Sequence, residues 1–270
     1  MSISIDLKFA ARLLFKKPVF TAVTTLIVAV GLGLTLYTYS LLNSLVFEPL
    51  VLNGKNPIVA IEAKFDHSHL SRRRADPLDL KRVEDEVDLF DGFGLYMEGT
   101  TLMGPYDGAP TETRGIQKYN STYVSWNVFE FSGVQPVLGR GFRPEDHHEG
   151  AEPTVVISYD VWQEYFNGRE SAVGSMIPLD SAETRVIGVM PQGFAFPAVA
   201  QIWQLVPQNY IEPTERSYSA AFAFARLKDG VTIADVEKEL AQINKSVQET
   251  IPERFAWRVR DNGDYLTVQH

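Results

Sequence analysis

The chain contains no cysteine among its 270 residues. Disulfide bonds, thiolate metal sites and cysteine nucleophiles are therefore excluded. The compartment stays open on this ground, because a domain of this size can fold without disulfides in an oxidising space. The sequence also lacks the G-x-S-x-G, H-E-x-x-H and P-loop patterns of common enzymes. We therefore expect no catalytic activity and no bound cofactor.

Positive charge is scarce beyond the first 17 residues. These carry a net charge of +3, and because the whole chain carries −9, residues 18–270 carry −12. An acidic region of this size is a poor match for the phosphate backbone of nucleic acids. The charge balance therefore predicts no nucleic-acid partner.

Charge of either sign is missing altogether from Pro18 to Phe47. About 20 helical residues cross a hydrocarbon core of roughly 30 Å, so this run is long enough to span a membrane. A cleaved signal peptide is the alternative, but its apolar region would be shorter, and no A-x-A site follows this run. We expect a transmembrane helix within 18–47, with membrane lipid around it.

The flanking charges predict how this helix is oriented. Lys8, Arg12, Lys16 and Lys17 precede it, whereas Glu48 is the first charged residue after it. By the positive-inside rule, the N-terminus is then cytoplasmic and residues 48–270 are periplasmic or extracellular. Residues 1–17 form either an amphipathic helix on the membrane surface or an extension of the span.

Small side chains recur at every fourth position inside the span, at Thr21, Thr25, Ala29 and Gly33. This spacing places them on one helix face, where they would allow another helix to approach closely. The alternative is that they reflect the general abundance of glycine and other small residues in membrane helices. We treat these four residues as the candidate helix-packing face.

Beyond the membrane segment, strand and helix patterns alternate. Strands are expected at 58–64, 95–103, 113–119, 154–158, 176–179, 184–189, 202–206, 220–227, 257–260 and 265–268. Helices are expected after Asp76–Pro77 until Gly92 and Gly94, over 123–131, after Ser158 until Asn167–Gly168, and from Thr232 to Pro252.

A few polar clusters invite a functional reading. His67 with His69, and His147 with His148, could contribute to a zinc site, but no second ligand pair has metal spacing, so we interpret each pair as part of a polar surface loop and expect no metal site. The run 72–74 (RRR) could meet an acidic partner or lipid headgroups, or be a solvated loop. The short 139–141 (GRG) run is too short for a phosphate cradle. An aromatic set is interpreted as core rather than as a ligand cage: Trp126, Phe129, Trp162, Tyr165 and Phe166.

Two stretches resemble a known family. Residues 138–197 contain a G-R-x-F element, a V-V-I-S strand that leads into a helix with Trp162 and Phe166, and a V-I-G-V-M-P strand end. This stretch resembles the periplasmic core domain of MacB-like permeases of the ABC transporter class. The start, IDLKFAARLLFKKPVFTAVTTLIVAVGLG, is similar to the first membrane segment of such permeases.

The resemblance implies an α+β fold, with one N-terminal transmembrane helix followed by a two-lobed mixed α/β extracytoplasmic domain. One lobe would comprise 48–103 and 218–270, and a β-rich lobe, 104–217, would be inserted into it. It also implies a permease component of an inner-membrane export, efflux or mechanotransmission system. Its partners would be a cytoplasmic ABC ATPase subunit and a second permease copy or half.

The family pattern continues with three further spans and a cytoplasmic coupling element, whereas this sequence stops at Gln269–His270. We therefore expect a chain truncated before the coupling spans. Its contact with the ATPase would be made through those missing spans. The alternative is a stand-alone, membrane-anchored periplasmic interaction domain without transport activity.

Overall fold

The computed structural model describes residues 18–42, 56–63, 74–105, 115–180, 182–216, 220–254 and 265–269. The chain divides into two compact units, Met1–Val51 and Leu52–His270. The predicted boundary near residue 48 lies outside the described residues and stays a prediction. Residues 1–17, predicted as an amphipathic helix or an extension of the span, lie outside the described residues. The last part of the predicted span, 43–47, lies outside them too.

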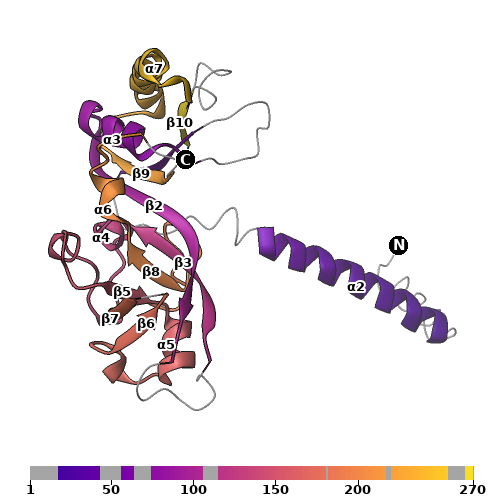
Figure 1. Ribbon diagram of the computed structural model, residues 1–270. Coiled ribbons are helices and arrows are strands. Elements are labelled where there is room, and N and C mark those ends of the chain that lie inside the picture. The colour runs from indigo at the N-terminus through magenta and orange to yellow at the C-terminus, as the bar shows by residue number, and fades with distance from the viewer. Residues whose placement is uncertain are drawn as a thin grey trace, which may run out of the picture. The chain divides into compact units, whose positions relative to one another are not determined.

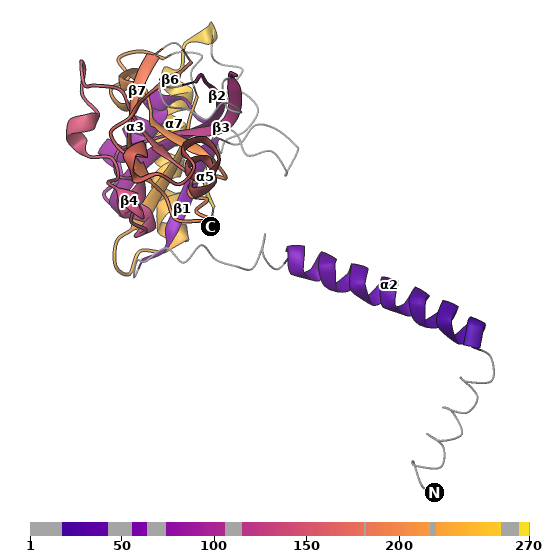
Figure 2. The same ribbon diagram turned by 90° about the horizontal axis from the view of Figure 1, so that it is seen from below.

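The described part of the first unit is one continuous helix, α2 (Pro18–Leu42) (Figure 1, Figure 2). Its segment Pro18–Tyr37 has a mean hydropathy of 2.2 and is long and apolar enough to cross a membrane. Two hydroxyls bond within the helix, Thr24 Oγ1 to Phe20 O and Thr35 Oγ1 to Gly31 O, each at 2.9 Å. These bonds satisfy polar groups that lipid could not. The described helix thus fits the predicted span.

The second unit is built on one large, mostly antiparallel sheet. Its strands are β1 (Ile58–Ala63), β2 (Phe90–Met103), β3 (Gln117–Val124), β4 (Leu138–Gly139), β5 (Thr154–Ile157), β6 (Met176–Leu179), β7 (Ala182–Val189), β8 (Ile202–Leu205), β9 (Phe222–Leu227) and β10 (Leu266–Gln269). Their order is β10-β1-β9-β2-β3-β8-β5-β7-β4, and β6 pairs with both β2 and β7. Only the β3–β8 and β5–β7 pairs are parallel among the described strands.

The pairing of β6 closes part of this sheet into a ring. The strands β2, β3, β8, β5, β7 and β6 each pair with the next, and β6 returns to β2 through Met103 and Leu179. Two backbone bonds hold this closure, from Gly104 N to Pro178 O at 2.9 Å and from Asp180 N to Leu102 O at 2.7 Å. The ring is therefore a small barrel in which the core side chains of the β-rich part are enclosed.

Strand β2 belongs both to this barrel and to the rest of the sheet. Its first half, from Phe90, pairs with β9, and its second half, to Met103, pairs with β3. Tyr96 is paired on both sides, with Phe222 of β9 and with Val124 of β3. In Figure 1 the long β2 ribbon runs from the end with α3 and β9 into the end with β3 and β6. The two ends thus share one backbone.

Three helices begin where local chemistry places them. Asp76 caps α3 (Pro77–Glu86) and Ser158 caps α5 (Tyr159–Phe166), each through a side-chain oxygen. Thr232 and Asp235 form a capping box at the start of α7 (Ile233–Thr250). The left-handed Asn167 and the following Gly168 end α5 as predicted. These caps satisfy backbone groups that would otherwise lack partners.

Two helix predictions are wrong at their ends. The first predicted helix does not continue to Gly92, because α3 ends at Glu86, and both Gly92 and Gly94 lie inside β2. The glycines allow close packing there: a Cβ on Gly94 would lie 2.4 Å from Phe224 Cζ. The helix predicted over 123–131 is α4 (Val128–Ser132) only, since Tyr123 and Val124 pair in β3.

Other boundaries shift by a few residues. The strand predicted at 113–119 is β3, which begins at Gln117 and continues to Val124. A four-residue helix, α6 (Gln208–Ile211), was not predicted. The predicted hairpin of 176–179 with 184–189 is confirmed as β6 and β7. The strand predicted at 257–260 lies outside the described residues.

Buried apolar side chains form three clusters along the sheet. The first lies between β1, β9, β10 and the helices α3 and α7, and includes Ile61 and Leu80. The second is aromatic and includes Phe129, Trp203 and Phe224. The third fills the barrel beside α5 and includes Ile177 and Phe166. The predicted division into lobes 48–103 plus 218–270 and 104–217 stays a prediction.

A buried ion pair ties the segment before β9 to α3. Arg216, which is 7% exposed, donates two hydrogen bonds of 2.5 Å to the fully buried Asp79 carboxylate. Asp76 lies 3.6 Å from the same guanidinium. Burial opposes the charged form of Arg216, but the two carboxylates outweigh this effect and raise its pKa. Removing one partner would leave uncompensated charge in the interior.

We predict that Arg216→Met lowers the free energy of unfolding by about 3–5 kcal/mol, because two buried carboxylates lose their cation. Lys228→Met is the matched control, since Lys228 pairs with Asp88, whose side chain is 98% exposed. That control should cost below about 1 kcal/mol. Denaturant unfolding of the full chain in neutral detergent measures both. Equal losses in the two variants would contradict the assigned role of Arg216.

Candidate functional site

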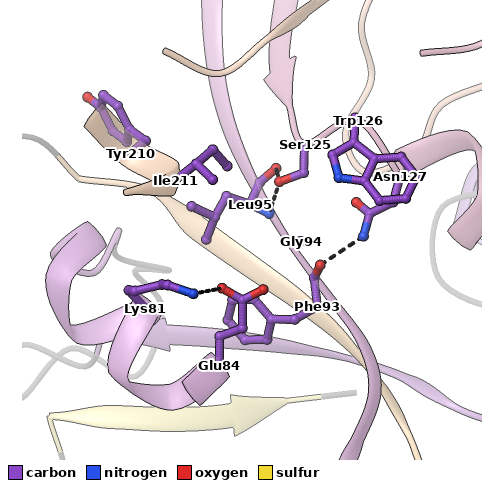
Figure 3. A pocket seen from close by; sticks show the side chains of 10 residues that line it. All are labelled: Lys81, Glu84, Phe93, Gly94, Leu95, Ser125, Trp126, Asn127, Tyr210 and Ile211. Atoms are coloured by element: carbon purple, nitrogen blue, oxygen red, sulfur yellow. Dashed lines mark hydrogen bonds and ion pairs between the residues drawn. The ribbon is translucent and has the colours of Figure 1, made fainter. Parts of the chain in front are cut away.

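A pocket of about 250 Å³ lies beside the point where β2 exchanges β9 for β3 as its partner. We call it the junction pocket (Figure 3). Four segments line it: α3, β2, the turn after β3, and α6. Its lining residues are Lys81, Glu84, Phe93, Gly94, Leu95, Ser125, Trp126, Asn127, Tyr210 and Ile211. It therefore combines aromatic, aliphatic and charged groups in one hollow.

The wall formed by α3 follows from helical periodicity. Leu80 and Val83 are fully buried in the first core cluster. Lys81 and Glu84 therefore point away from that core, with side chains 35% and 42% exposed. In Figure 3 these two side chains lie across the hollow from Trp126 and Asn127. The amphipathic pattern of α3 thus brings one cation and one anion to the pocket.

On the opposite wall, side chains of the turn after β3 replace a neighbouring strand as hydrogen-bond partners of β2. After β3 ends at Val124, Ser125 N donates to Leu95 O at 2.9 Å, and Leu95 N donates to Ser125 Oγ at 2.7 Å. Asn127 Nδ2 then donates to Phe93 O at 2.9 Å. These bonds continue the backbone pairing of β2 without a strand. Trp126, between the two polar residues, is held at the pocket.

Asn127 has one polar atom left over. It stands at the N-cap position of α4, yet its side chain makes no capping bond. Its Oδ1 is buried and has no hydrogen-bond partner within the part of the chain that the structure describes. A buried acceptor without a donor costs roughly 1–3 kcal/mol, so it is a group that a ligand could satisfy.

The charges on α3 are unequally paired. Lys81 Nζ lies 2.7 Å from Asp85 and 3.2 Å from Glu84. The hydrogen bond to Asp85 raises the pKa of Lys81, against partial desolvation, and Glu84 adds to the effect. Asp85 is therefore the principal partner of Lys81, and the Glu84 carboxylate at the pocket is the more weakly neutralised of the two.

A second hollow, of about 450 Å³, lies at one end of the barrel and contains the predicted histidine pair. His147 is half-buried and its Nε2–H donates to Val206 O at 2.7 Å, whereas His148 Nδ1 lies 2.5 Å from Glu145 O. Each ring thus contacts a different backbone carbonyl. Among the described residues no three His, Asp or Glu side chains form a metal-binding group. His67 and His69 lie outside the described residues.

The aromatic set is largely confirmed as core. Phe129, Tyr165 and Phe166 are at most 3% exposed. Trp126 and Trp162 are partly buried against the second and third clusters, respectively. Trp126 differs from the others because it also lines the junction pocket. The interpretation as core was therefore incomplete for this residue.

The basic elements have separate structural contexts. Arg140 in the 139–141 run contacts Asp146 through two bonds of 2.5 and 2.8 Å. Gly139 has a φ of +74°, and a Cβ there would lie 2.2 Å from Ile187 O, so only glycine fits. Arg74 is exposed, and Arg72 and Arg73 lie outside the described residues.

The four predicted packing residues do lie on one side of α2 by their spacing. Thr25, Ala29 and Gly33 are exposed, and Thr21 is partly so. A Cβ added at Gly33 would meet no atom within 4 Å. No second helix accompanies α2 among the described residues of its unit. Their role as a packing face stays a prediction.

Sequence reasoning missed most of the junction pocket. Trp126 was the only lining residue singled out, and Gly94 was assigned to a helix end. The acidic run at the end of α3, Glu84 to Glu86, was the available signal. It could not be used, because Glu84 comes to line one pocket with Asn127 and Tyr210 only through the folding of distant segments.

An N-terminal helix that is long and apolar enough to cross a membrane, followed by a mixed α/β, sheet-rich domain, defines the class of protein. The chain belongs to the family of MacB-like periplasmic core domains, whose family model matches residues 21–243. The match covers most of α2 and most of the second unit.

One curated relative is the macrolide export ATP-binding/permease protein MacB of Bdellovibrio bacteriovorus, 26% identical over 144 residues. The aligned part is 49% of this chain but 19% of that protein, so the chain spans about a fifth of its length. Residues for most of that relative's length thus have no counterpart in the alignment.

Two solved structures share the fold. The periplasmic region of MacB from Actinobacillus actinomycetemcomitans matches with a TM-score of 0.57 and 13% identity, covering 80% of this chain and 89% of that one. The extracellular domain of the noncanonic ABC-type transporter YknZ from Gram-positive bacteria matches with a TM-score of 0.54 and 12% identity, covering 79% and 100%. At these identities the likeness concerns the fold alone.

We predict that protonation of His147 lowers the free energy of unfolding as the pH decreases. Burial lowers the pKa of His147 below its ordinary 6.5, so the unfolded chain binds the proton more readily than the folded one. This contribution is complete above pH 6.5 and is lost as the pH falls toward the lower folded pKa.

Denaturant unfolding of the full chain at pH 7.5 and 5.5 tests this. His147→Asn should reduce the loss of stability between the two values, and the neighbouring, exposed His148→Asn serves as the control. The prediction fails if His147→Asn leaves the pH dependence unchanged.

Proposed function

We propose that this chain is a membrane-anchored permease component of a MacB-like ABC export or mechanotransmission system. In this role its extracytoplasmic domain contacts substrate or partner proteins. The observation that carries the proposal is the family match over 21–243, which joins the apolar helix and the sheet domain in one unit of sequence. A membrane helix that continues into an extracytoplasmic domain is suited to passing motion between the two.

The proposed topology is a single pass through the bacterial inner membrane, with the N-terminus in the cytoplasm and residues 48–270 outside. The basic flank Lys8 to Lys17 and the uncharged run behind it support this orientation. A cytoplasmic ABC ATPase subunit is the proposed energy source, consistent with the ATP-binding/permease name of the Bdellovibrio relative. A second copy or another permease half would supply further spans.

The proposal is tested by purifying the tagged full chain from native membranes in mild detergent. An ABC ATPase and a protein with further spans should be recovered with it. If the chain is recovered without either, the stand-alone interaction domain is the better description.

We predict the topology as follows. Because the natural chain has no cysteine, one introduced thiol reports on its own position. In cells with a permeabilised outer membrane, Glu149→Cys, at an exposed position, should react with a membrane-impermeant maleimide. Ser2→Cys should react only after lysis. If Glu149→Cys reacts with the maleimide only after lysis, the orientation is the reverse of the one proposed.

We predict that the small-residue face of α2 packs against another span. Gly33→Ile should reduce recovery of partner subunits by about fivefold, since close helix packing contributes roughly 1 kcal/mol. Gly31→Ile is a matched control: a Cβ at either glycine meets no atom within 4 Å, but Gly31 lies two residues away on another face. Equal recovery of partner subunits with both variants would show that Gly33 does not belong to a packing face.

A further inference from the structure

The junction pocket presents three partly exposed aromatic residues, Phe93, Trp126 and Tyr210. Aromatic faces carry partial negative charge, and they attract ammonium and guanidinium groups within about 6 Å. Partly exposed aromatic side chains gathered around a hollow are also frequent anchors at protein interfaces. The walls of this pocket therefore favour a cation with an apolar stem.

The charges at the pocket also favour a cation. The last turn of α3 contains no basic residue and carries Glu84, Asp85 and Glu86, where the negative end of the helix dipole makes carboxylates unfavourable. Lys81 neutralises Asp85 first, at 2.7 Å against 3.2 Å for Glu84. Residues 18–270 as a whole carry −12. A cationic group would thus be attracted at long range and paired at Glu84.

Hydrogen bonding completes the chemistry. Oδ1 of Asn127, on the wall opposite Glu84, is a buried acceptor without a donor in the described structure (Figure 3). Ammonium and guanidinium groups carry several N–H donors and no acceptor. Such a group could therefore supply the donor that Asn127 Oδ1 lacks.

We propose that the junction pocket binds a lysine or arginine side chain of a partner protein. At about 250 Å³ the pocket is slightly smaller than the roughly 300–1,000 Å³ of small-molecule sites, and it suits one side chain. Tyr210 and Ile211 on α6 extend its apolar wall and would contact the stem of that side chain. Binding here requires no coupling to ATP, so it stands apart from the proposed transport role.

The test titrates the full chain in neutral detergent with N-acetyl-lysine methylamide and follows tryptophan fluorescence. Trp126 lines the pocket, so the signal should change on binding and should be lost in Trp126→Phe, which keeps an aromatic wall. N-acetyl-norleucine methylamide, which lacks the charge, should bind at least about tenfold more weakly, as expected for a lost charged hydrogen bond. Added salt should weaken binding of the lysine probe.

Two substitutions on α3 should act in opposite directions. Glu84→Gln should weaken binding about tenfold, because the paired carboxylate is lost. Lys81→Met should tighten it, because the competing internal cation is removed. Glu237→Gln, an exposed residue of α7 outside the pocket, should change nothing. Both α3 side chains are partly exposed, so these variants should fold normally, which circular dichroism checks.

Three results would overturn the inference. Equal affinity for the norleucine and lysine probes would make the pocket a plain apolar hollow. Unchanged binding of the lysine probe in both Glu84→Gln and Lys81→Met would show that charge on α3 does not select the ligand. Equal affinity for free 1,5-diaminopentane would replace the partner protein with a small amine as its occupant.

Discussion

The backbone pairing of strand β2 is the constraint on which the remaining structure depends. Its 14 residues pair with β9 in the first half and with β3 in the second, and Tyr96 pairs with both. Because every buried backbone N–H and C=O needs a partner, the residues beyond each pairing must be satisfied in another way. Ser125 and Asn127 do this for Leu95 and Phe93. The junction pocket is thus a consequence of how the sheet changes partners.

The buried ion pair between Arg216 and Asp79 positions two other walls of the junction pocket. The chain returns from the barrel to β9 through α6 and Arg216, and Arg216 is held by Asp79 of α3. This pair positions the segment that carries Tyr210 and Ile211 next to the helix that carries Lys81 and Glu84. A partner bound in the pocket would therefore contact elements from both ends of the sheet domain.

Membership in the MacB-like periplasmic core family places this architecture in a membrane context. The apolar helix α2 and the sheet domain are separate compact units, each with its own solvent requirement. The helix α2 is apolar and two of its hydroxyls bond within the helix, whereas residues 18–270 as a whole carry a net charge of −12. The two solved relatives share the fold of the second unit at 12% and 13% identity, so the architecture tolerates extensive change of sequence.

Local chemistry was sufficient to predict α2, the caps at Asp76, Ser158 and Thr232, and the β6–β7 hairpin, because neighbouring residues carry each of these signals. Tertiary structure alone decided the ends of α3 and α4, because Gly92 and Tyr123 lie in strands that pair with other segments of the sheet. It also decided the closure of the barrel and the ion pair between Asp79 and Arg216, which are 137 residues apart. The junction pocket belongs to this second group. Its walls come from four segments, and sequence spacing carries no information on which of them meet in space.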